Sequence, residues 1–193
     1  MALVDNFDSY NDGDLNGQGS WAGNVAFDVQ ASVVQAGAKA VSCASDSVSI
    51  YKNFVSQAAG AQVYYMRSTA LERDTYVIFK EGTSNKVYTW LWSGDIGFNT
   101  SAGNFNVKTD AVINTWYKIR FEWRLNATVY EGRMSVDDGA FSDWKTLATT
   151  WTTGLDRISL ETGEQAAGTS YWDSFSDPNA PPPAVGRSQG MII

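Results

Sequence analysis

Alternating apolar and polar residues dominate the chain and predict β-strands rather than helices. The clearest stretch runs from Trp116 to Leu125. One face carries the apolar set Tyr117, Ile119, Phe121, Trp123 and Leu125, and the other carries Trp116, Lys118, Arg120, Glu122 and Arg124. This pattern predicts a long antiparallel strand with one buried face and one face in water.

A second alternating segment, residues 85–92, separates aromatic from aliphatic side chains. Tyr88, Trp90 and Trp92 fall on one face, and Val87, Thr89 and Leu91 fall on the other. The aromatic face is either a binding platform in solvent or the core side of the strand. Because large aromatic side chains are more often buried, we favour the core interpretation.

Further strands are predicted at about 2–7, 24–30, 38–43, 47–56, 61–68, 74–81, 104–108, 129–137, 144–149, 155–162 and 169–176. Turn sequences such as Asn11-Asp-Gly-Asp and Asp137-Asp-Gly separate them. Around a dozen short strands joined in this way predict an all-β, two-sheet antiparallel sandwich.

The last residues differ from the rest. Pro178-Asn-Ala-Pro-Pro-Pro is a stiff, extended spacer before an apolar tip. We therefore predict a sandwich domain at 1–177 and a short, extended, Pro-rich C-terminal arm at 178–193. The arm is either a disordered tail or a segment that docks on a neighbouring subunit. In the docking hypothesis the contacts are made by Val185, Arg187, Met191, Ile192 and Ile193.

Composition excludes several kinds of site. The 193 residues include no His and one Cys. The chain therefore cannot build a Ser-His-Asp triad, a His metal ligand, an intramolecular disulfide or a Cys-rich zinc site. The net charge of −7 argues against binding to nucleic acid. No apolar run is long enough for a membrane helix, and the first residues lack the features of a secretory signal.

Four segments resemble the concanavalin A-like (LamG-like) jelly-roll domains of bacterial and phage proteins. They are the opening strand and turn at 4–21, the long strand at 115–123, the following hairpin at 135–144 and the closing strand at 169–175. The resemblance covers roughly residues 3–176 and implies a jelly-roll sandwich. It implies little about function, since one fold hosts lectins, hydrolases, lyases and structural modules.

The enzymatic branches of this superfamily imply residues that the sequence lacks. The glucanase branch implies a Glu-x-Asp-x-x-Glu strand. Here Glu72 and Asp74 alternate, but Arg73 separates them and no third acid follows at the right place. The alginate-lyase branch implies a His and a Tyr, and there is no His. We therefore predict that the protein is not an enzyme; a hydrolase would depend on Glu122 or Glu72.

Two other kinds of site are candidates. Sugar binding requires aromatic platforms, for which we name Tyr88, Trp90, Trp92 and Trp116. Calcium is common on the fold that the chain resembles. Asp5 on the first strand and Asp173 on the last would be neighbours if those strands pair, and their carboxylates could form part of an oxygen cage. Alternatively, they are ordinary acids of edge strands. No other cofactor is expected.

Two functional hypotheses follow. The first is a non-enzymatic structural protein of a larger assembly, above all a virion, as a phage capsid decoration or tail accessory subunit. Its partners would be other subunits or copies of itself, and it would be made in the host cytoplasm and lie on the virion surface. The alternative is a carbohydrate-binding module for cell-surface or extracellular polysaccharide. Neither hypothesis involves nucleic acid or a membrane.

Overall fold

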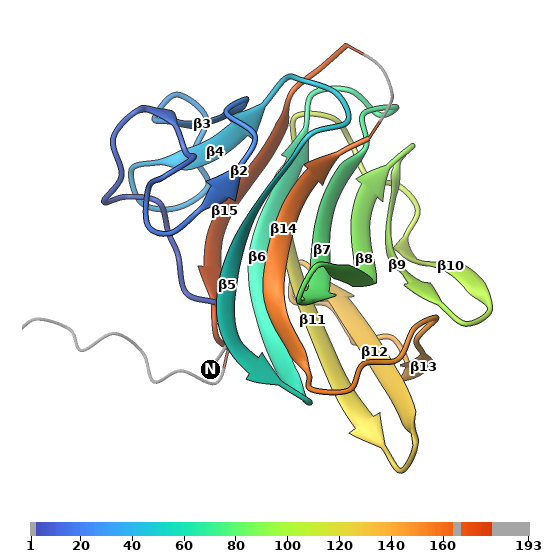
Figure 1. The fold of residues 1–193 in the computed structure, drawn as a ribbon. Coiled ribbons are helices and arrows are strands. Elements are labelled where there is room, and N and C mark those ends of the chain that lie inside the picture. Colours follow the sequence, from blue (N-terminus) through green and yellow to red (C-terminus); the bar gives the residue numbers. More distant parts are fainter. Residues whose placement is uncertain (1–2, 164–166, 179–193) are drawn as a thin grey trace, which may run out of the picture.

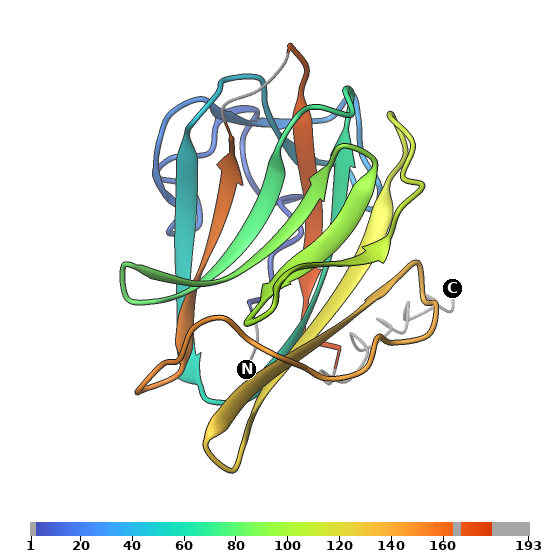
Figure 2. The ribbon, with the colours of Figure 1, turned by 90° about the vertical axis from the view of Figure 1, so that its right-hand side faces the viewer.

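The computed structural model describes residues 3–163 and 167–178 and confirms the two-sheet sandwich. Two antiparallel sheets lie face to face, and the core fills the space between them (Figures 1 and 2). No helix occurs within these described residues, so none of them belongs to a helix that could cross a membrane.

The strands divide into a sheet of eight and a sheet of seven. The eight-stranded sheet consists, in spatial order, of β1 (Gly13–Asp14), β3 (Phe27–Gln30), β4 (Ala40–Cys43), β15 (Ser170–Ser176), β6 (Gly60–Ser68), β11 (Tyr117–Asn126), β12 (Val129–Val136) and β13 (Lys145–Thr146). The seven-stranded sheet consists of β10 (Gly103–Lys108), β9 (Asp95–Thr100), β8 (Ser84–Trp92), β7 (Thr75–Glu81), β14 (Leu155–Thr162), β5 (Ser49–Gln57) and β2 (Ala22–Gly23).

The alternation in β11 behaves as predicted over most of its length. Its apolar face from Tyr117 to Trp123 is buried, and Phe121 packs against Phe79 of the opposite sheet with ring centroids 5.3 Å apart. Leu125 is the exception, with 45% of its surface exposed. It lies near the tip of the β11–β12 hairpin, which extends past the end of the sandwich (Figure 1).

The prediction of a strand at 2–7 is wrong. Within residues 3–7 the only pairing is a single bridge between Asp5 and Phe175. The Asp5 carboxylate accepts the backbone N–H of Phe7, which has a positive φ of 62°. A local bond of this kind competes with a regular strand ladder, and it turns the chain away from β15.

Strand β9 was not predicted. Its sequence, Asp95-Ile-Gly-Phe-Asn-Thr, contains Gly97, which weakens the strand signal. The predicted strand at 144–149 is reduced to the two residues of β13. The boundary between domain and arm at 177/178 stays a prediction, because residues 179–193, including the proposed contacts Val185, Arg187, Met191, Ile192 and Ile193, lie outside the described residues.

Candidate functional site

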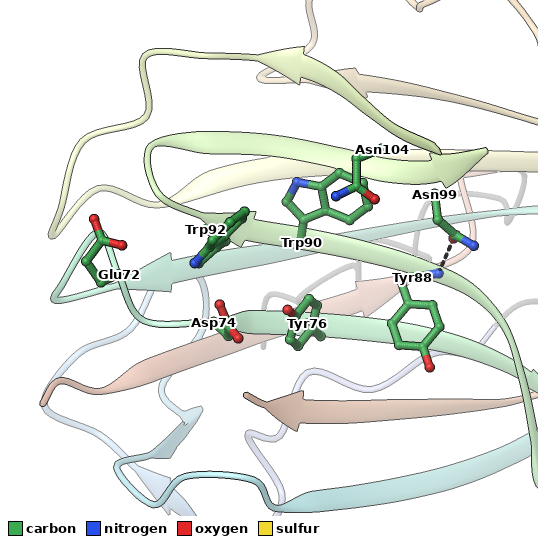
Figure 3. Close-up of a pocket in the computed structure, with 8 residues that line it drawn as sticks. All are labelled: Glu72, Asp74, Tyr76, Tyr88, Trp90, Trp92, Asn99 and Asn104. Atoms are coloured by element: carbon green, nitrogen blue, oxygen red, sulfur yellow. Dashed lines mark hydrogen bonds between the residues drawn. The ribbon is translucent and has the colours of Figure 1, made fainter. Parts of the chain in front are cut away.

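A cleft of about 770 Å³ opens on the outer face of the seven-stranded sheet. This volume is in the range of small-molecule sites, roughly 300–1,000 Å³. Four neighbouring strands and the turn before β7 supply its walls (Figure 3). The lining residues are Glu72, Asp74, Tyr76, Tyr88, Trp90, Trp92, Asn99 and Asn104.

The aromatic face of β8 forms the wall of this cleft. Val87 and Thr89 are fully buried in the sandwich, so Tyr88, Trp90 and Trp92 point the other way, into the cleft (Figure 3). The favoured core interpretation of these three side chains is therefore wrong. Trp90 is nevertheless only 5% exposed, whereas Trp92 is 40% exposed, because the outer face is itself crowded around Trp90.

Gly97 provides the space that Trp90 occupies. It pairs with Trp90 across β8 and β9. A Cβ at this position would lie 2.9 Å from the indole and 2.2 Å from the carbonyl oxygen of Phe105 on β10. Only glycine permits this close approach. Gly97, which weakens the strand signal of β9 in the sequence, is therefore also the residue that makes room for the Trp90 ring.

Tyrosine and amide groups complete the floor of the cleft. Tyr76 lies opposite Trp90 in the β7–β8 register and meets the Tyr88 ring edge to face at 6.2 Å. The Oδ1 of Asn99 accepts the backbone N–H of Tyr88 at 2.6 Å. This bond fixes the side chain with its NH₂ group, a hydrogen-bond donor, directed away from the Tyr88 backbone (Figure 3).

Two carboxylates stand at one end of the aromatic row. Arg73 is buried, so its neighbours Glu72 and Asp74 project from the opposite side of the chain into the cleft. Burial raises the pKa of Asp74; the Glu72 charge acts in the same direction, while a hydrogen bond with Tyr76 and the Arg73 charge oppose the rise. Burial, together with Asp74, also raises the pKa of Tyr76 to about 12, so its hydroxyl remains protonated.

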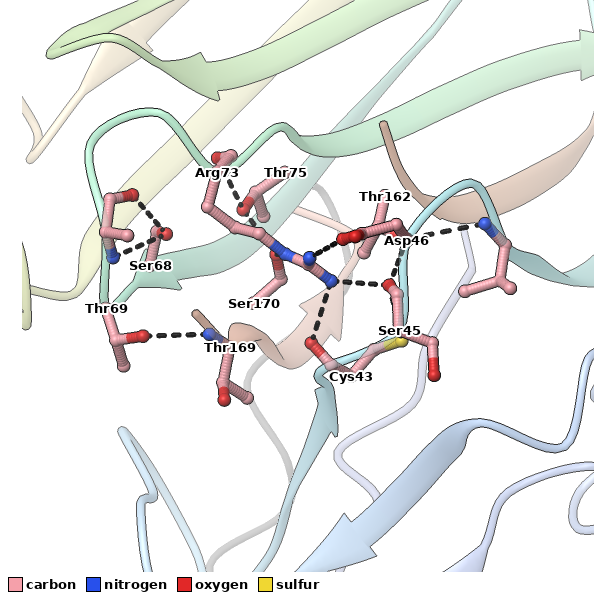
Figure 4. Close-up of polar contacts among 12 residues, drawn as sticks. Cys43, Ser45, Asp46, Ser68, Thr69, Arg73, Thr75, Thr162, Thr169 and Ser170 are labelled. Carbon is pink, nitrogen blue, oxygen red and sulfur yellow. Dashed lines mark hydrogen bonds and ion pairs between the residues drawn. The ribbon is translucent and has the colours of Figure 1, made fainter. Parts of the chain in front are cut away.

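A buried arginine anchors this end of the cleft. Arg73 is 1% exposed and its guanidinium forms an ion pair with Asp46 (Figure 4). It also donates to the carbonyl oxygens of Cys43 and Ser45 and, at 3.4 Å, to the Ser170 hydroxyl. These bonds tie the turn before β7 to the loop after β4 and to β15, and so fix the direction in which the two acids project.

Trp116 is not part of this site. It precedes β11 in the eight-stranded sheet, where its ring meets Tyr171 edge to face at 6.2 Å. Of the four predicted sugar-binding residues, the structure thus gathers three. The sequence prediction omitted five lining residues from the sugar site: Glu72, Asp74, Tyr76, Asn99 and Asn104. The one available signal was the alternation of Glu72, Asp74 and Tyr76 through the β7 segment.

The predicted calcium pair is not assembled. Trp172 donates to the Tyr76 carbonyl of the opposite sheet at 3.1 Å, so Trp172 points inward and Asp173 points outward. The Asp173 carboxylate accepts the backbone N–H groups of Gln35 and Ala36. Asp5 instead points into the sandwich, where it accepts hydrogen bonds from Tyr10, Trp21 and Lys52.

Both carboxylates are therefore saturated by N–H and O–H donors, which are the wrong partners for a cation. No group of three or more potential metal ligands occurs within 3–163 and 167–178.

Comparison with known proteins establishes the fold only. No family model matches the chain, and no curated protein matches it. Among solved structures, a sialidase is similar over 92% of this chain with a TM-score of 0.68 and 10% identity, but the match spans 18% of that protein. A transglycosylase in its apo form is similar over 94% of this chain and 85% of its own, with a TM-score of 0.60 and 13% identity. A Bacillus licheniformis β-glucanase is similar over 90% of this chain and 96% of its own, with a TM-score of 0.56 and 13% identity. The chain thus has the concanavalin A-like sandwich that the sequence resemblance implied.

These likenesses contradict the prediction that the protein is not an enzyme. The sandwich is shared with a transglycosylase, a glucanase and the catalytic domain of a glycoside hydrolase family 131 protein from Coprinopsis cinerea. The prediction relied on the absence of His and of one strand motif. It overlooked that Glu72 and Asp74 flank a buried Arg73 and enter the same cleft. Glu122, the other acid considered, lies on the opposite sheet between Arg120 and Arg133.

Proposed function

We propose that the protein binds a polysaccharide chain in the cleft of the seven-stranded sheet. The proposal rests on one observation above all: Tyr88, Trp90 and Trp92 project from a single strand into a cleft that also holds amide and carboxylate groups. Aromatic faces pack against the apolar faces of sugar rings, and the polar groups bind their hydroxyls.

The size of the platform favours a chain over a single sugar. Side chains two residues apart on a strand lie roughly 7 Å from one another. A row from Tyr88 to Trp92 therefore extends over roughly 14 Å and offers successive contacts along an extended ligand. Solved proteins of the same fold with glycan-related names, such as the β-glucanase, add support by analogy.

The assembly hypothesis has no such support. The sialidase, the transglycosylase and the β-glucanase that share the fold do not support a virion role, and the arm on which the hypothesis depends lies outside the described residues. Carbohydrate recognition is thus the better supported of the two original hypotheses.

A second candidate function, cleavage of the bound glycan, is favoured by the acid pair. Glycosidases use one carboxylic acid with a raised pKa to protonate the leaving oxygen, and a second, ionised carboxylate on the other side of the bond. In this scheme Asp74, whose pKa burial raises, acts in the pH range where it is protonated and gives its proton to the glycosidic oxygen as the C–O bond breaks. Glu72 serves as the ionised carboxylate, which attacks the anomeric carbon or removes a proton from the attacking water.

Substitution of the exposed tryptophan of the cleft tests the binding proposal. Trp92→Ala removes a stacking surface and should weaken binding to a soluble polysaccharide three- to tenfold or more, since an aromatic contact is worth about 0.5–1.5 kcal/mol beyond its buried area. Trp116→Ala, on the other sheet, is the matched control and should bind normally. Affinity electrophoresis over a panel of polysaccharides is the measurement. No binding by the intact protein, or equal losses in both variants, would contradict the proposal.

The cleavage scheme has its own test. Asp74→Asn keeps the shape of the side chain but removes its proton, so release of reducing ends should fall by at least a hundredfold while binding persists. Glu122→Gln, on the opposite sheet, is the control and should leave the rate unchanged. A binding-competent protein that releases no reducing ends from any bound glycan would eliminate this second function and leave the first intact.

A further inference from the structure

The charges around the cleft are unequally distributed. Its eight lining residues include two carboxylates, Glu72 and Asp74, and no lysine or arginine. A third carboxylate, Asp95, lies directly opposite Trp92 in the β8–β9 register. The remaining lining groups are neutral amides and aromatic rings, so the charged groups that a ligand meets there are negative.

The cations of β7 and of the turn before it, Arg73 and Lys80, do not offset these charges toward a ligand. Arg73 directs its guanidinium to Asp46 and to carbonyl oxygens on the buried side of the chain (Figure 4). Lys80 lies farther along β7 and is paired with Glu161 at 2.6 Å. Neither Arg73 nor Lys80 is among the residues that line the cleft.

From this arrangement we infer that the cleft selects uncharged glycans and rejects glycans that carry carboxylate or sulfate groups. The inference rests on the proposed function, because it names the class of polysaccharide that the same site would take. A negative group on a sugar seated over Trp92 would stand within several ångströms of Glu72 and Asp74. At the effective dielectric constant of such sites, the repulsion lowers affinity by a factor on the order of ten to a hundred.

Neutral sugars avoid this loss and still use the whole site. Their hydroxyls donate to the carboxylate oxygens of Glu72 and Asp74 and accept from the NH₂ group of Asn99, which lines the cleft. Their ring faces cover the exposed indole of Trp92 and the half-buried ring of Tyr88. Charge–dipole bonds of this kind remain when salt is added, whereas the repulsion of acidic glycans is screened.

The test compares matched ligands at neutral pH. Neutral glucan oligosaccharides and oligouronates of equal length are titrated into the intact protein by calorimetry at low and at high salt. We expect the neutral ligands to bind at least tenfold more tightly at low salt, and the difference to shrink as salt rises. Equal or tighter binding of the oligouronates would overturn the inference while leaving the proposed function in place.

Variants locate the cause of the selection. Glu72→Gln and Asp74→Asn, singly and together, should raise oligouronate affinity relative to neutral affinity, with the double variant gaining tenfold or more. Asp138→Asn, whose carboxylate pairs with Lys118 on the other sheet, is the charge-matched control and should gain nothing. A selectivity that the double variant retains unchanged would also overturn the inference. Absence of binding to both ligand classes would instead refute the proposed function.

Discussion

Asp74 sits where a single methyl group on a neighbouring residue would displace it. A Cβ at Gly163, just after β14, would lie 1.9 Å from Oδ2 of Asp74 and 2.7 Å from its Cβ. The two residues also share a backbone hydrogen bond, from the Gly163 N–H to the Asp74 carbonyl, at 3.4 Å. Gly163 therefore sets the position of the carboxylate, although nothing in the sequence associates the two.

Gly163→Ala is predicted to turn Asp74 toward solvent. Loss of burial should lower the pKa of Asp74 toward its ordinary value, because burial is the largest cause of its rise. If the carboxylic acid is the active form, the decline of cleavage with rising pH should then begin at lower pH. NMR titration of the Asp74 carboxyl carbon and the pH profile of cleavage measure the two effects.

Gly139→Ala is a fitting control for this substitution. Its Cβ meets only the Val136 carbonyl, at 3.0 Å, in a turn that follows the other sheet's β12. It should reproduce any general cost of replacing a glycine and leave the Asp74 titration as it is. An unchanged Asp74 pKa in Gly163→Ala would show that Gly163 does not position the acid.

At the scale of elements, one carboxylate accepts four hydrogen bonds from a connection between the sheets. The chain crosses from β13 to β14 through residues 147–154, and Glu81 at the end of β7 fastens this crossing. Its Oε1 accepts the backbone N–H groups and the hydroxyls of both Thr152 and Thr153, at 2.7–2.9 Å. These bonds, first of all that from the Thr153 N–H, lower the pKa of Glu81 to about 2.

Acid should therefore loosen this crossing selectively. A carboxyl whose pKa is lowered in the folded state stabilises that state above its ordinary pKa, near 4.5, and the contribution is lost as pH falls toward about 2. We expect the Thr152 and Thr153 amides to lose protection from hydrogen exchange over that window. Glu81→Gln should expose them already at pH 6 and abolish the acid-dependent step.

Glu161→Gln, on the adjacent strand, is the control for this experiment. Glu161 pairs with Lys80 and does not contact the crossing, so the protection of the two threonine amides should follow the wild-type curve. If protection of these amides in the wild-type protein does not change with pH, the hydrogen bonds of Glu81 do not hold the crossing.

Elements also show what sequence can and cannot reveal. Alternation located β8 and β11 correctly, because one face of each is buried. It could not tell which face of β8 is buried, since that choice depends on the strands beside it. Gly97 weakened the strand signal of β9, because glycine is uncommon inside strands. Arg73 hid the shared direction of its two acidic neighbours, because arginine is rarely fully buried. The cleft requires both residues.

At the scale of the whole molecule, one buried ion pair ties the N-terminal segment to the sandwich. Lys52 lies on β5 opposite the buried Ile158, so its side chain starts on the inner face of the seven-stranded sheet. Its Nζ reaches Asp5 at 2.8 Å and the Tyr10 hydroxyl at 3.2 Å. Trp21 donates to the same Asp5 carboxylate at 2.8 Å. The segment before β3 supplies the edge strands β1 and β2, one to each sheet, and this ion pair fixes it to the seven-stranded sheet.

Lys52→Met is accordingly predicted to destabilise the entire fold rather than the N-terminal segment alone. Removing one partner leaves the Asp5 charge buried without its cation, which typically costs about 3–5 kcal/mol. Urea unfolding should show a single transition at lower denaturant. Lys118→Met, whose partner Asp138 is 74% exposed, should cost about 1 kcal/mol or less.

In the double variant Lys52→Met/Asp5→Asn the loss should be smaller than the sum of the single losses, because the unpaired charge is gone. Additive losses, or a Lys52→Met variant as stable as Lys118→Met, would mean that the sandwich holds its N-terminal segment by apolar packing of Phe7 and Trp21 instead.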